Sequence, residues 1–334
     1  MGDLIHTLPA LSDAKNALKD VKFDWVTDPA FAEIPRWHPT VNQIIPAPLR
    51  QWRKQKIKSL RNGSVKQFRQ MLRQTKYDFI IDAQSALKSA LIARLARGRR
   101  AGMDKNSVRE YGAHWFYADR YPIAKDQHAI KRLRTLFANT LGYSHPENQP
   151  DFGIDRTQLP KSPIELPEKY ILIVHSTTWK TKHWPETHWQ ELIKHITGHG
   201  LPALLPWANE NEKQRAERLA AGNKNVIVLP KMTLSECGTV INKATAAIAV
   251  DTGLGHLCAA LEIPTIHLYG PTDPNKIGAH GKNQMLLTAK FPCAPCYLKN
   301  CNYNTAIDGK PVCYSSLPAD LIWNTLQNLL SKQY

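Results

Sequence analysis

The chain has 334 residues, 43% of them hydrophobic and 22% charged, which is typical of a globular protein and suits two domains of roughly 150 residues each. No run of roughly eighteen apolar residues occurs, which argues against a transmembrane helix, and no basic segment followed by an apolar one opens the chain, which argues against secretion. The formal net charge of +16 indicates an anionic partner. We therefore expect a cytoplasmic protein whose six cysteines are reduced.

The first half of the chain alternates short apolar segments with helical ones. It opens at Met1 with a turn that enters a helix. The next segments predict strands at 22–27, 43–46 and 77–82 and helices at 89–97 and 125–141. A region rich in Pro, Asn, Gln and Asp follows at 142–162 and is typical of a linker. The domains are therefore expected at 1–150 and 151–334.

No strand precedes the opening helix. A Rossmann-like domain normally has its first strand near the centre of the sheet, so its absence predicts a gap in the sheet with exposed pairing edges. Either the domain manages without this strand or the true start lies upstream of Met1, and we favour the second interpretation.

The second half alternates strands and helices regularly. The predicted strands are 170–174, 203–205, 226–229, 246–250 and 265–268, and helices follow from about 185, 210, 234 and 254. This alternation predicts parallel sheets with right-handed crossovers, hence an α/β, doubly wound protein of two domains with a cleft between them.

The most informative turn lies between strand 246–250 and the next helix. It places Asp251, Thr252 and Gly253 at the carboxyl end of a strand, where a helix begins. Free backbone N–H groups and the positive end of the helix dipole favour an anion at such a place, and open α/β sheets bind ligands there. The turn therefore predicts a phosphate site.

Basic residues are unevenly placed. Ten Lys or Arg residues and no acid lie between Arg50 and Lys76, and a second cluster spans 94–100. A solvated helix face is one interpretation. Mutual repulsion makes an anionic partner the better one, with nucleic acid, an anionic membrane surface and an acidic substrate all open.

Several separate motifs, in order, resemble the lipopolysaccharide heptosyltransferases, inverting glycosyltransferases of the two-domain GT-B architecture. The resemblance covers about residues 1–285. Its motifs are Met1-Gly2-Asp3 with His6-Thr7-Leu8-Pro9, Arg50-Gln51-Trp52-Arg53-Lys54, Ile81-Asp82-Ala83-Gln84, Lys88-Ser89, Gly102-Met103-Asp104, Arg109-Glu110, Lys182-His183-Trp184-Pro185, 250–256 and Gly281-Lys282-Asn283-Gln284. It implies transfer of L-glycero-D-manno-heptose from ADP-heptose to the Kdo of Kdo-lipid A, without a metal or other cofactor.

The resemblance assigns Asp3 as the catalytic base that takes the proton of the acceptor hydroxyl. A simple N-cap is the structural alternative for this residue. The donor-binding residues that the resemblance implies are Thr177, Thr178, Lys182, Met232, Asp251, Thr252, Gly253 and His256. His256 could equally pack its helix. The chain departs from the family at Gly255, where Ser is usual, and at Ser235, where a ribose-binding Glu is usual and Glu236 stands one place later.

The acceptor-binding residues implied are Arg50, Arg53, Lys54 and Arg109, with Gln51 where the family usually has Arg. Kdo-lipid A is anionic and lies in the inner leaflet, so the resemblance implies peripheral attachment to the cytoplasmic face of the inner membrane, no nucleic acid, and a monomer. Trp52 could rest at the membrane interface or belong to the core.

The C-terminal tail carries Cys293, Cys296, Cys301 and Cys313. A C-x-x-C pair with two further cysteines can build a tetrahedral zinc site, but reduced packing cysteines are favoured here. Cys237 and Cys258 fall on helices and are expected in the core. Similar tails occur in family members that add a later heptose, which is one alternative function. A nucleic-acid-binding protein is the alternative from another class, with no recognised binding motif to support it.

Overall fold

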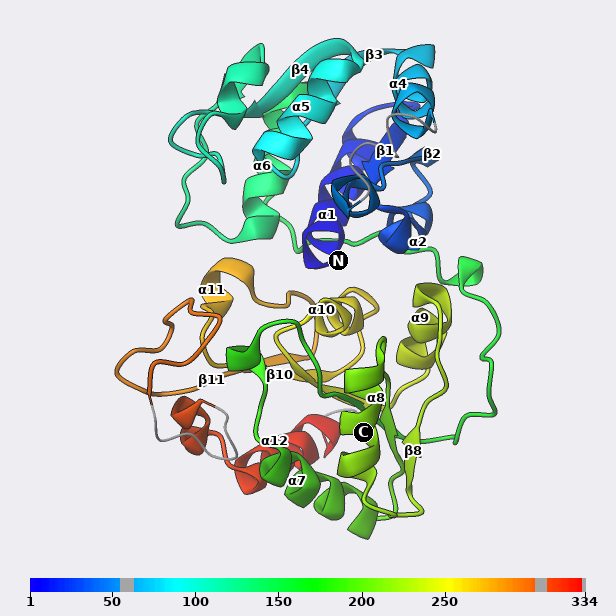
Figure 1. The fold of residues 1–334 in the computed structure, drawn as a ribbon, viewed down its shortest axis with the longest axis vertical. Helices are drawn as coiled ribbons and strands as arrows, with labels where there is room; N and C mark the ends of the chain where they lie inside the picture. The colour runs from blue at the N-terminus through cyan, green and yellow to red at the C-terminus, as the bar shows by residue number, and fades with distance from the viewer. Residues whose placement is uncertain (55–62, 304–310, 332–334) are drawn as a thin grey trace. The chain divides into compact units, whose positions relative to one another are not determined.

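The computed structural model describes residues 1–54, 63–303 and 311–331. The chain divides into two compact units (Figure 1). One extends to Arg156 and the other begins at Thr157, so the division falls inside the predicted linker and slightly after the expected boundary at residue 150. Within the described ranges, no helix combines the length and the apolar character needed to cross a membrane.

The first unit consists of short parallel strands and helices. Residues 49–54 are also helical. The remaining elements are α1 (Gly2–Ala17), β1 (Phe23–Thr27), η1 (Pro29–Phe31), α2 (Glu33–Arg36), β2 (Val41–Pro46), α4 (Ser64–Gln74), β3 (Lys76–Ile81), α5 (Leu87–Leu95), β4 (Arg97–Met103), η2 (Ala113–Phe116), β5 (Asp119–Tyr121), α6 (Ala129–Leu141) and η3 (Arg156–Gln158).

The described strands of this unit form two separate sheets. In the described residues β1 pairs with β2, and β3, β4 and β5 form a second sheet, all in parallel. A side-chain bond links the two sheets, because the Tyr77 hydroxyl on β3 donates to Asp24 on β1 at 2.8 Å. Burial and this carboxylate raise the pKa of Tyr77 to about 12, which keeps the hydroxyl a donor.

Two strands of the first unit were not predicted. The sequence of β4 is Arg-Gly-Arg-Arg-Ala-Gly-Met; its arginine-rich half pairs with β3, and its apolar half pairs with β5. Arg99 forms a bidentate bond with Asp119 of β5, at 2.6 and 2.7 Å. Two helix predictions were also wrong at their ends: the helix at 89–97 ends at Leu95, and the helix at 125–141 begins only at Ala129, after an N-cap at His128.

Helix α1 is anchored in the core of the first unit. Its residues from Ile5 to Ala14 are buried. At its buried side Asp13 accepts two bonds from the Arg134 guanidinium of α6, at 2.6 and 2.9 Å. A buried ion pair held this way costs desolvation but strongly penalises any other placement of the helix. The N-terminal turn of α1 is therefore held on a fixed helix.

The second unit contains one larger sheet and more regular helices. Its elements are β6 (Ile171–Val174), η4 (Lys180–Lys182), α7 (Glu186–Gly198), β7 (Ala203–Leu205), α8 (Glu210–Ala220), β8 (Val226–Val228), α9 (Leu234–Asn242), β9 (Ala246–Val250), α10 (Gly253–Ala260), β10 (Thr265–Tyr269), α11 (Pro274–Ile277), β11 (Gln284–Thr288), η5 (Val312–Ser316) and α12 (Ala319–Ser331).

The sheet of the second unit is entirely parallel, with strand order β11-β10-β9-β6-β7-β8. Strands β6, β9 and β10 are buried along their whole length, which explains their continuous apolar sequences. Helix α7 packs on α8 and α12, and α9 packs on α10, on the opposite face of the sheet (Figure 1). This is the Rossmann order, whose reversal point lies between β6 and β9.

Candidate active site

The reversal point of the second unit's sheet brings two loops together. The chain leaves β6 toward one face of the sheet and leaves β9 toward the other, and in open α/β sheets ligands bind beyond the carboxyl ends of such strands. The loop after β6 runs over residues 175–183, and the turn after β9 holds Asp251 and Thr252. The donor residues predicted on these two loops therefore do meet.

Asp251 is the centre of this arrangement. Its carboxylate is only 5% exposed, and one oxygen lies 2.6 Å from the Lys182 ammonium. The same oxygen accepts a bond of 2.6 Å from the Thr272 hydroxyl, beyond the end of β10. The other oxygen lies 3.7 Å from Nε2 of His256 on α10. Thus Asp251 organises the side chains around it.

The charge of Asp251 is held by these partners. Burial by itself raises the pKa of this carboxyl, but the bond with His256, the Lys182 ammonium and the Thr272 hydroxyl together hold the pKa well below its usual range. Asp251 is therefore ionised throughout the physiological pH range and fixes Lys182 at the end of β9. The sequence predicted both residues at the site but not this direct pairing.

The loop after β6 is held by its own bonds. The Thr177 hydroxyl donates to the carbonyl of Asp251 at 3.1 Å, and Nε2 of His183 lies 2.9 Å from the Thr177 carbonyl. The Lys182 ammonium also lies 4.6 Å from the centre of the Trp179 ring. Thr178 is exposed. Thr177 thus joins the two loops, while Thr178 offers its hydroxyl to solvent.

The helix that follows Asp251 presents free backbone donors. Thr252 is the N-cap of α10, and its side chain makes no capping bond. The N–H groups of the first turn, which begins at Gly253, therefore keep their capacity for an external acceptor. Their partial positive charge and the nearby Lys182 ammonium suit a phosphate group.

Two residues of α10 show how closely it packs. His256 is buried, and its Nε2 lies 3.7 Å from Asp251, so it packs within the fold beside the carboxylate of the candidate site. A Cβ added at Gly255 would lie 3.1 Å from Cβ of Ala249 and 3.4 Å from Nδ1 of His267. The departure from the family's usual Ser at 255 therefore leaves no space vacant at this position.

Met232 lies just before α9, and Glu236 lies in its first turn. Met232 is half-buried beside apolar residues that include Leu172, Leu229 and Leu254. Glu236 forms a capping box with Thr233, in which each side chain bonds the other's backbone N–H, at 2.7 and 3.2 Å. The Glu236 carboxylate is thus engaged at the helix terminus.

Asp3 lies on the first turn of α1 in the first unit. Its side chain is 64% exposed and pairs with Arg109 at 3.1 Å. The helix N-cap is Met1, and no side chain caps this helix, so the N-cap interpretation of Asp3 is wrong. The structure thus joins the predicted base to one of the predicted acceptor residues, through a loop far away in the sequence.

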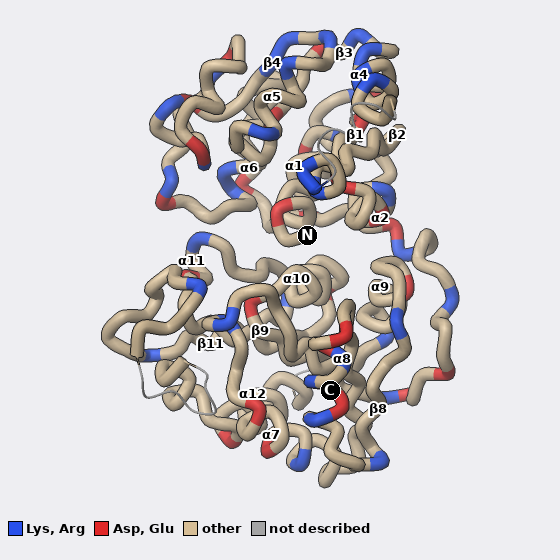
Figure 2. The backbone as a smooth tube through the Cα atoms, in the orientation of Figure 1, with Lys and Arg blue, Asp and Glu red and all other residues tan. Residues whose placement is uncertain are grey.

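The basic stretch lies on the surface of the first unit. Arg50, Arg53 and Lys54 are exposed, and further Lys and Arg residues lie along α4 and β4 (Figure 2). Three of the ten basic residues (Lys56, Lys58 and Arg61) lie outside the described residues. Trp52 is half-buried, packs edge-on against Phe68 at 5.2 Å and donates to Ser64 at 3.1 Å, so it belongs to the core.

A buried carboxylate at the end of β3 has an organising role. Asp82 accepts bonds from the hydroxyls of Ser89 and Tyr117, at 2.9 and 2.6 Å, and from two backbone N–H groups of the following turn. Burial nevertheless raises its pKa. These contacts explain the Asp-Ala-Gln motif as the anchor of the turn that leads into α5.

The cysteines fall into two groups. Cys237 and Cys258 are buried, as predicted. Of the four tail cysteines only Cys313 is buried, while Cys293 and Cys301 are exposed, so the packing interpretation is wrong for these two residues. Elsewhere in the described chain, Glu191, His195 and Asp320 place possible metal ligands within 4.8 Å of one another, on the partly exposed surface of α7 and α12.

Comparison with known proteins identifies relatives over nearly the whole chain. The profile described as "Glycosyltransferase family 9 (heptosyltransferase)" matches residues 65–307. The chain is 46% identical to lipopolysaccharide heptosyltransferase 1 of Pseudomonas aeruginosa, over 99% of this chain and 95% of the relative. It is 27% identical to lipopolysaccharide heptosyltransferase 2 of Salmonella typhimurium, over 71% and 70%. The solved E. coli heptosyltransferase WaaC with ADP matches with a TM-score of 0.86 and 42% identity, over 98% of this chain and 96% of that one.

Proposed function

Since the chain belongs to glycosyltransferase family 9, the heptosyltransferases, we propose that it transfers L-glycero-D-manno-heptose from ADP-heptose to the Kdo of Kdo-lipid A, in the synthesis of the lipopolysaccharide core. The observation that carries the proposal is the cradle at the end of β9, where Lys182, held by Asp251, stands beside the free N–H groups of α10. A nucleoside diphosphate has the charge that this cradle suits.

The chemistry proposed is a single displacement with inversion. The Asp3 carboxylate takes the proton of the acceptor hydroxyl while the hydroxyl oxygen of the acceptor attacks C1 of the heptose. The bond from C1 to the β-phosphate oxygen breaks. The electron pair leaves with ADP. Lys182 and the N-terminus of α10 stabilise the charge that develops on the departing phosphate, as preorganised donors do in other transfer reactions.

Two features of the first unit support this role for Asp3. The exposed Asp3 carboxylate is open to an acceptor hydroxyl, and the Arg109 guanidinium at 3.1 Å holds it in place. Arg109 and the exposed basic residues 50, 53 and 54 provide partners for the carboxylates and phosphates of the acceptor. A positive surface also favours attachment to an anionic leaflet.

The alternative that adds a later heptose is the less supported one, because the type 2 relative shares 27% identity against 46% for the type 1 relative. The family assignment does not favour the nucleic-acid-binding alternative. To test the acceptor, the protein is incubated with ADP-heptose and either Kdo-lipid A or its heptosylated product, and the products are weighed by mass spectrometry. The proposal predicts one added heptose on Kdo-lipid A only. Transfer to the heptosylated product alone would establish the later step.

A further inference from the structure

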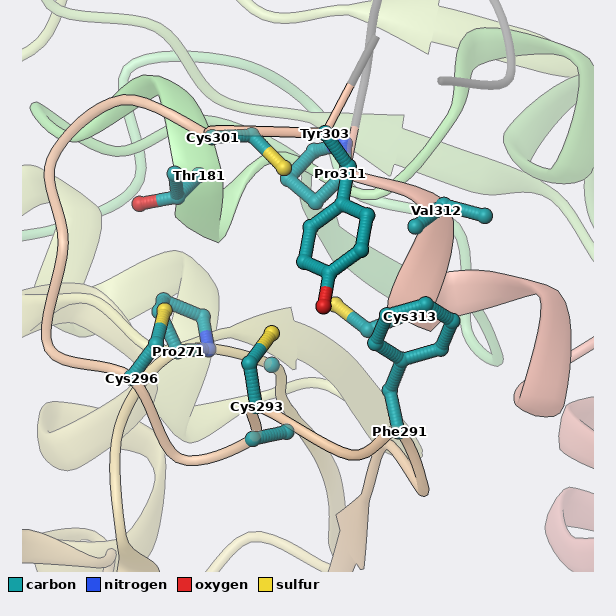
Figure 3. A pocket seen from close by; sticks show the side chains of 12 residues that line it. Thr181, Pro271, Phe291, Cys293, Cys296, Cys301, Tyr303, Pro311, Val312 and Cys313 are labelled. Atoms are coloured by element: carbon teal, nitrogen blue, oxygen red, sulfur yellow. The ribbon is translucent and has the colours of Figure 1, made fainter. Parts of the chain in front are cut away.

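The side chains of Cys293, Cys296, Cys301 and Cys313 line a single pocket of the second unit, which we term the cysteine pocket (Figure 3). Its wall is completed by Thr181, by Gly270 and Pro271 after β10, and by apolar and aromatic side chains of the tail. Figure 3 shows the four thiols facing this space from its different sides. None of the described lining residues is a carboxylate or a histidine. Apart from the hydroxyls of Thr181 and Tyr303, the side-chain donors of the pocket are sulfurs.

The four thiols come from separate positions of the tail and converge on one pocket. A cation placed among such thiols stabilises them as thiolates. The same grouping is poorly explained by packing, since Cys293 and Cys301 are exposed.

The donor set selects the class of ion. Four thiolates with a C-x-x-C pair at one end form the tetrahedral arrangement that structural zinc prefers, whereas magnesium and calcium require oxygen. Zinc–sulfur bonds of about 2.3 Å would place the sulfurs about 3.8 Å apart. No three of these described sulfurs yet lie within 4.8 Å of one another, so a bound ion would draw the thiols inward.

The segment that carries the thiols contacts the loop that carries Lys182. The Thr181 hydroxyl donates to the carbonyl of Leu298 at 2.5 Å, and the Tyr314 hydroxyl donates to the carbonyl of Lys182 at 3.2 Å. The Lys299 ammonium lies 5.7 Å from the centre of the Trp179 ring, which also contacts Lys182. Whatever fixes the tail therefore supports the donor loop.

We propose that the cysteine pocket binds one zinc ion through its four thiolates, and that the ion holds the tail against the loop of residues 175–183. Binding releases the four thiol protons and involves no oxidation or reduction. The ion contacts neither donor nor acceptor, so the cysteines are positioning residues. Only the expected effect on ADP binding rests on the proposed function.

Metal content gives the first test. The full-length protein is purified under reducing conditions without added metal, and zinc, iron and copper are measured by mass spectrometry. About one zinc per chain is expected. In Cys296→Ser and Cys301→Ser the zinc should fall to background, whereas the control variant Cys237→Ser, outside the pocket, should retain it. Zinc retained in both pocket variants would overturn the proposal.

A second measurement does not depend on variants that might fail to fold. Metal-free, reduced wild-type protein is titrated with Co²⁺, and the absorption of tetrahedral cobalt and of thiolate-to-cobalt charge transfer is followed. One equivalent should produce both signals, and Zn²⁺ should abolish them. Absence of the signals, with all four thiols reactive in the native protein, would overturn the proposal. A native disulfide among these cysteines would do the same.

The link to the donor loop is tested by ADP affinity. Loading metal-free protein with Zn²⁺ should strengthen ADP binding about fivefold or more, measured by calorimetry. Equal affinity with and without bound zinc would remove the positioning role and leave the metal site intact. Failure of the zinc-loaded protein to bind ADP at all would instead count against the proposed function, so the two results are distinguishable.

Discussion

At the scale of single residues, the site depends on pairings between distant parts of the sequence. Asp251 was predicted at a phosphate site from its turn after a strand, and Lys182 from the family resemblance. Their contact at 2.6 Å was not predicted, because spacing along the chain carries no information about which side chains meet across a sheet. Glu236 shows the same limit, since its capping box with Thr233 could be predicted from the Thr-x-x-Glu pattern but was not.

Replacing Lys182 tests the donor cradle. Lys182→Ala removes a charged partner of the diphosphate, so ADP binding should weaken by roughly 10–100-fold, as expected for hydrogen bonds to charged groups. The control is Lys180→Ala, since Lys180 is exposed on the same turn. Calorimetric titration of both variants with ADP gives the comparison. Equal affinity in the two variants would exclude Lys182 as a phosphate ligand.

Replacing Asp3 tests the proposed base. Asp3→Asn keeps the shape of the side chain and removes its basicity, so kcat should fall about a hundredfold or more while ADP binding is unchanged. Asp20→Asn is the matched control, because Asp20 is exposed just after α1 at φ 57°, a conformation that Asn also tolerates. Turnover near the wild-type rate in Asp3→Asn would remove this residue from the base role.

At the scale of elements, prediction succeeded where burial is continuous. Strands β6, β9 and β10 are apolar along their length because both faces are covered, and the sequence shows this directly. Strand β4 was missed because its exposed end carries arginines whose partners, such as Asp119, lie on another strand. The start of α6 was placed too early because an amphipathic pattern does not mark the N-cap, which His128 provides.

The pH dependence of stability follows from buried histidines. Burial lowers the pKa of His267, on β10, to about 4, although its bond with Gln284 on β11 opposes the shift. The folded state therefore binds fewer protons than the unfolded state between about pH 6.5 and pH 4, and stability is lost as the pH falls through this window. Burial likewise lowers the pKa of His38 in the first unit to about 4.

Thermal unfolding at several pH values between about 7.5 and 4.5 checks this expectation, because this range includes the unfolded-state histidine pKa of about 6.5. The midpoint temperature should fall toward acid pH, and His267→Gln should make that dependence shallower. His199→Gln should not, because His199 is exposed at the end of α7. A midpoint in wild type that does not change from neutral to acid pH would contradict the assignment of buried neutral histidines.

At the scale of the whole molecule, the uneven distribution of charge along the sequence indicates an anionic partner. The basic residues Arg50, Arg53 and Lys54 lie on the surface of the first unit, where such a partner can reach them. Their position does not identify the acceptor, because a cationic surface attracts lipids, sugars and nucleic acids alike. The choice among these anionic partners therefore rests on the family assignment and not on the charge.

Charge reversal tests the role of this surface. Arg53→Glu with Lys54→Glu should raise the acceptor KM about tenfold and leave the donor KM nearly unchanged, with an effect that shrinks as salt is added. The control reverses Lys194 and Lys224, two exposed lysines of the second unit. An equal rise of KM in the control pair would show that net charge, and not this surface, determines acceptor binding.

The central structural claim is that the second unit holds the donor diphosphate between Lys182 and the N-terminus of α10. A crystal structure of the protein with ADP tests it most directly. We expect the β-phosphate within hydrogen-bond distance of the Lys182 ammonium and of first-turn N–H groups of α10, with adenine toward Met232. A diphosphate bound elsewhere, with Lys182 still paired only with Asp251, would show that the second unit does not hold the donor in this way.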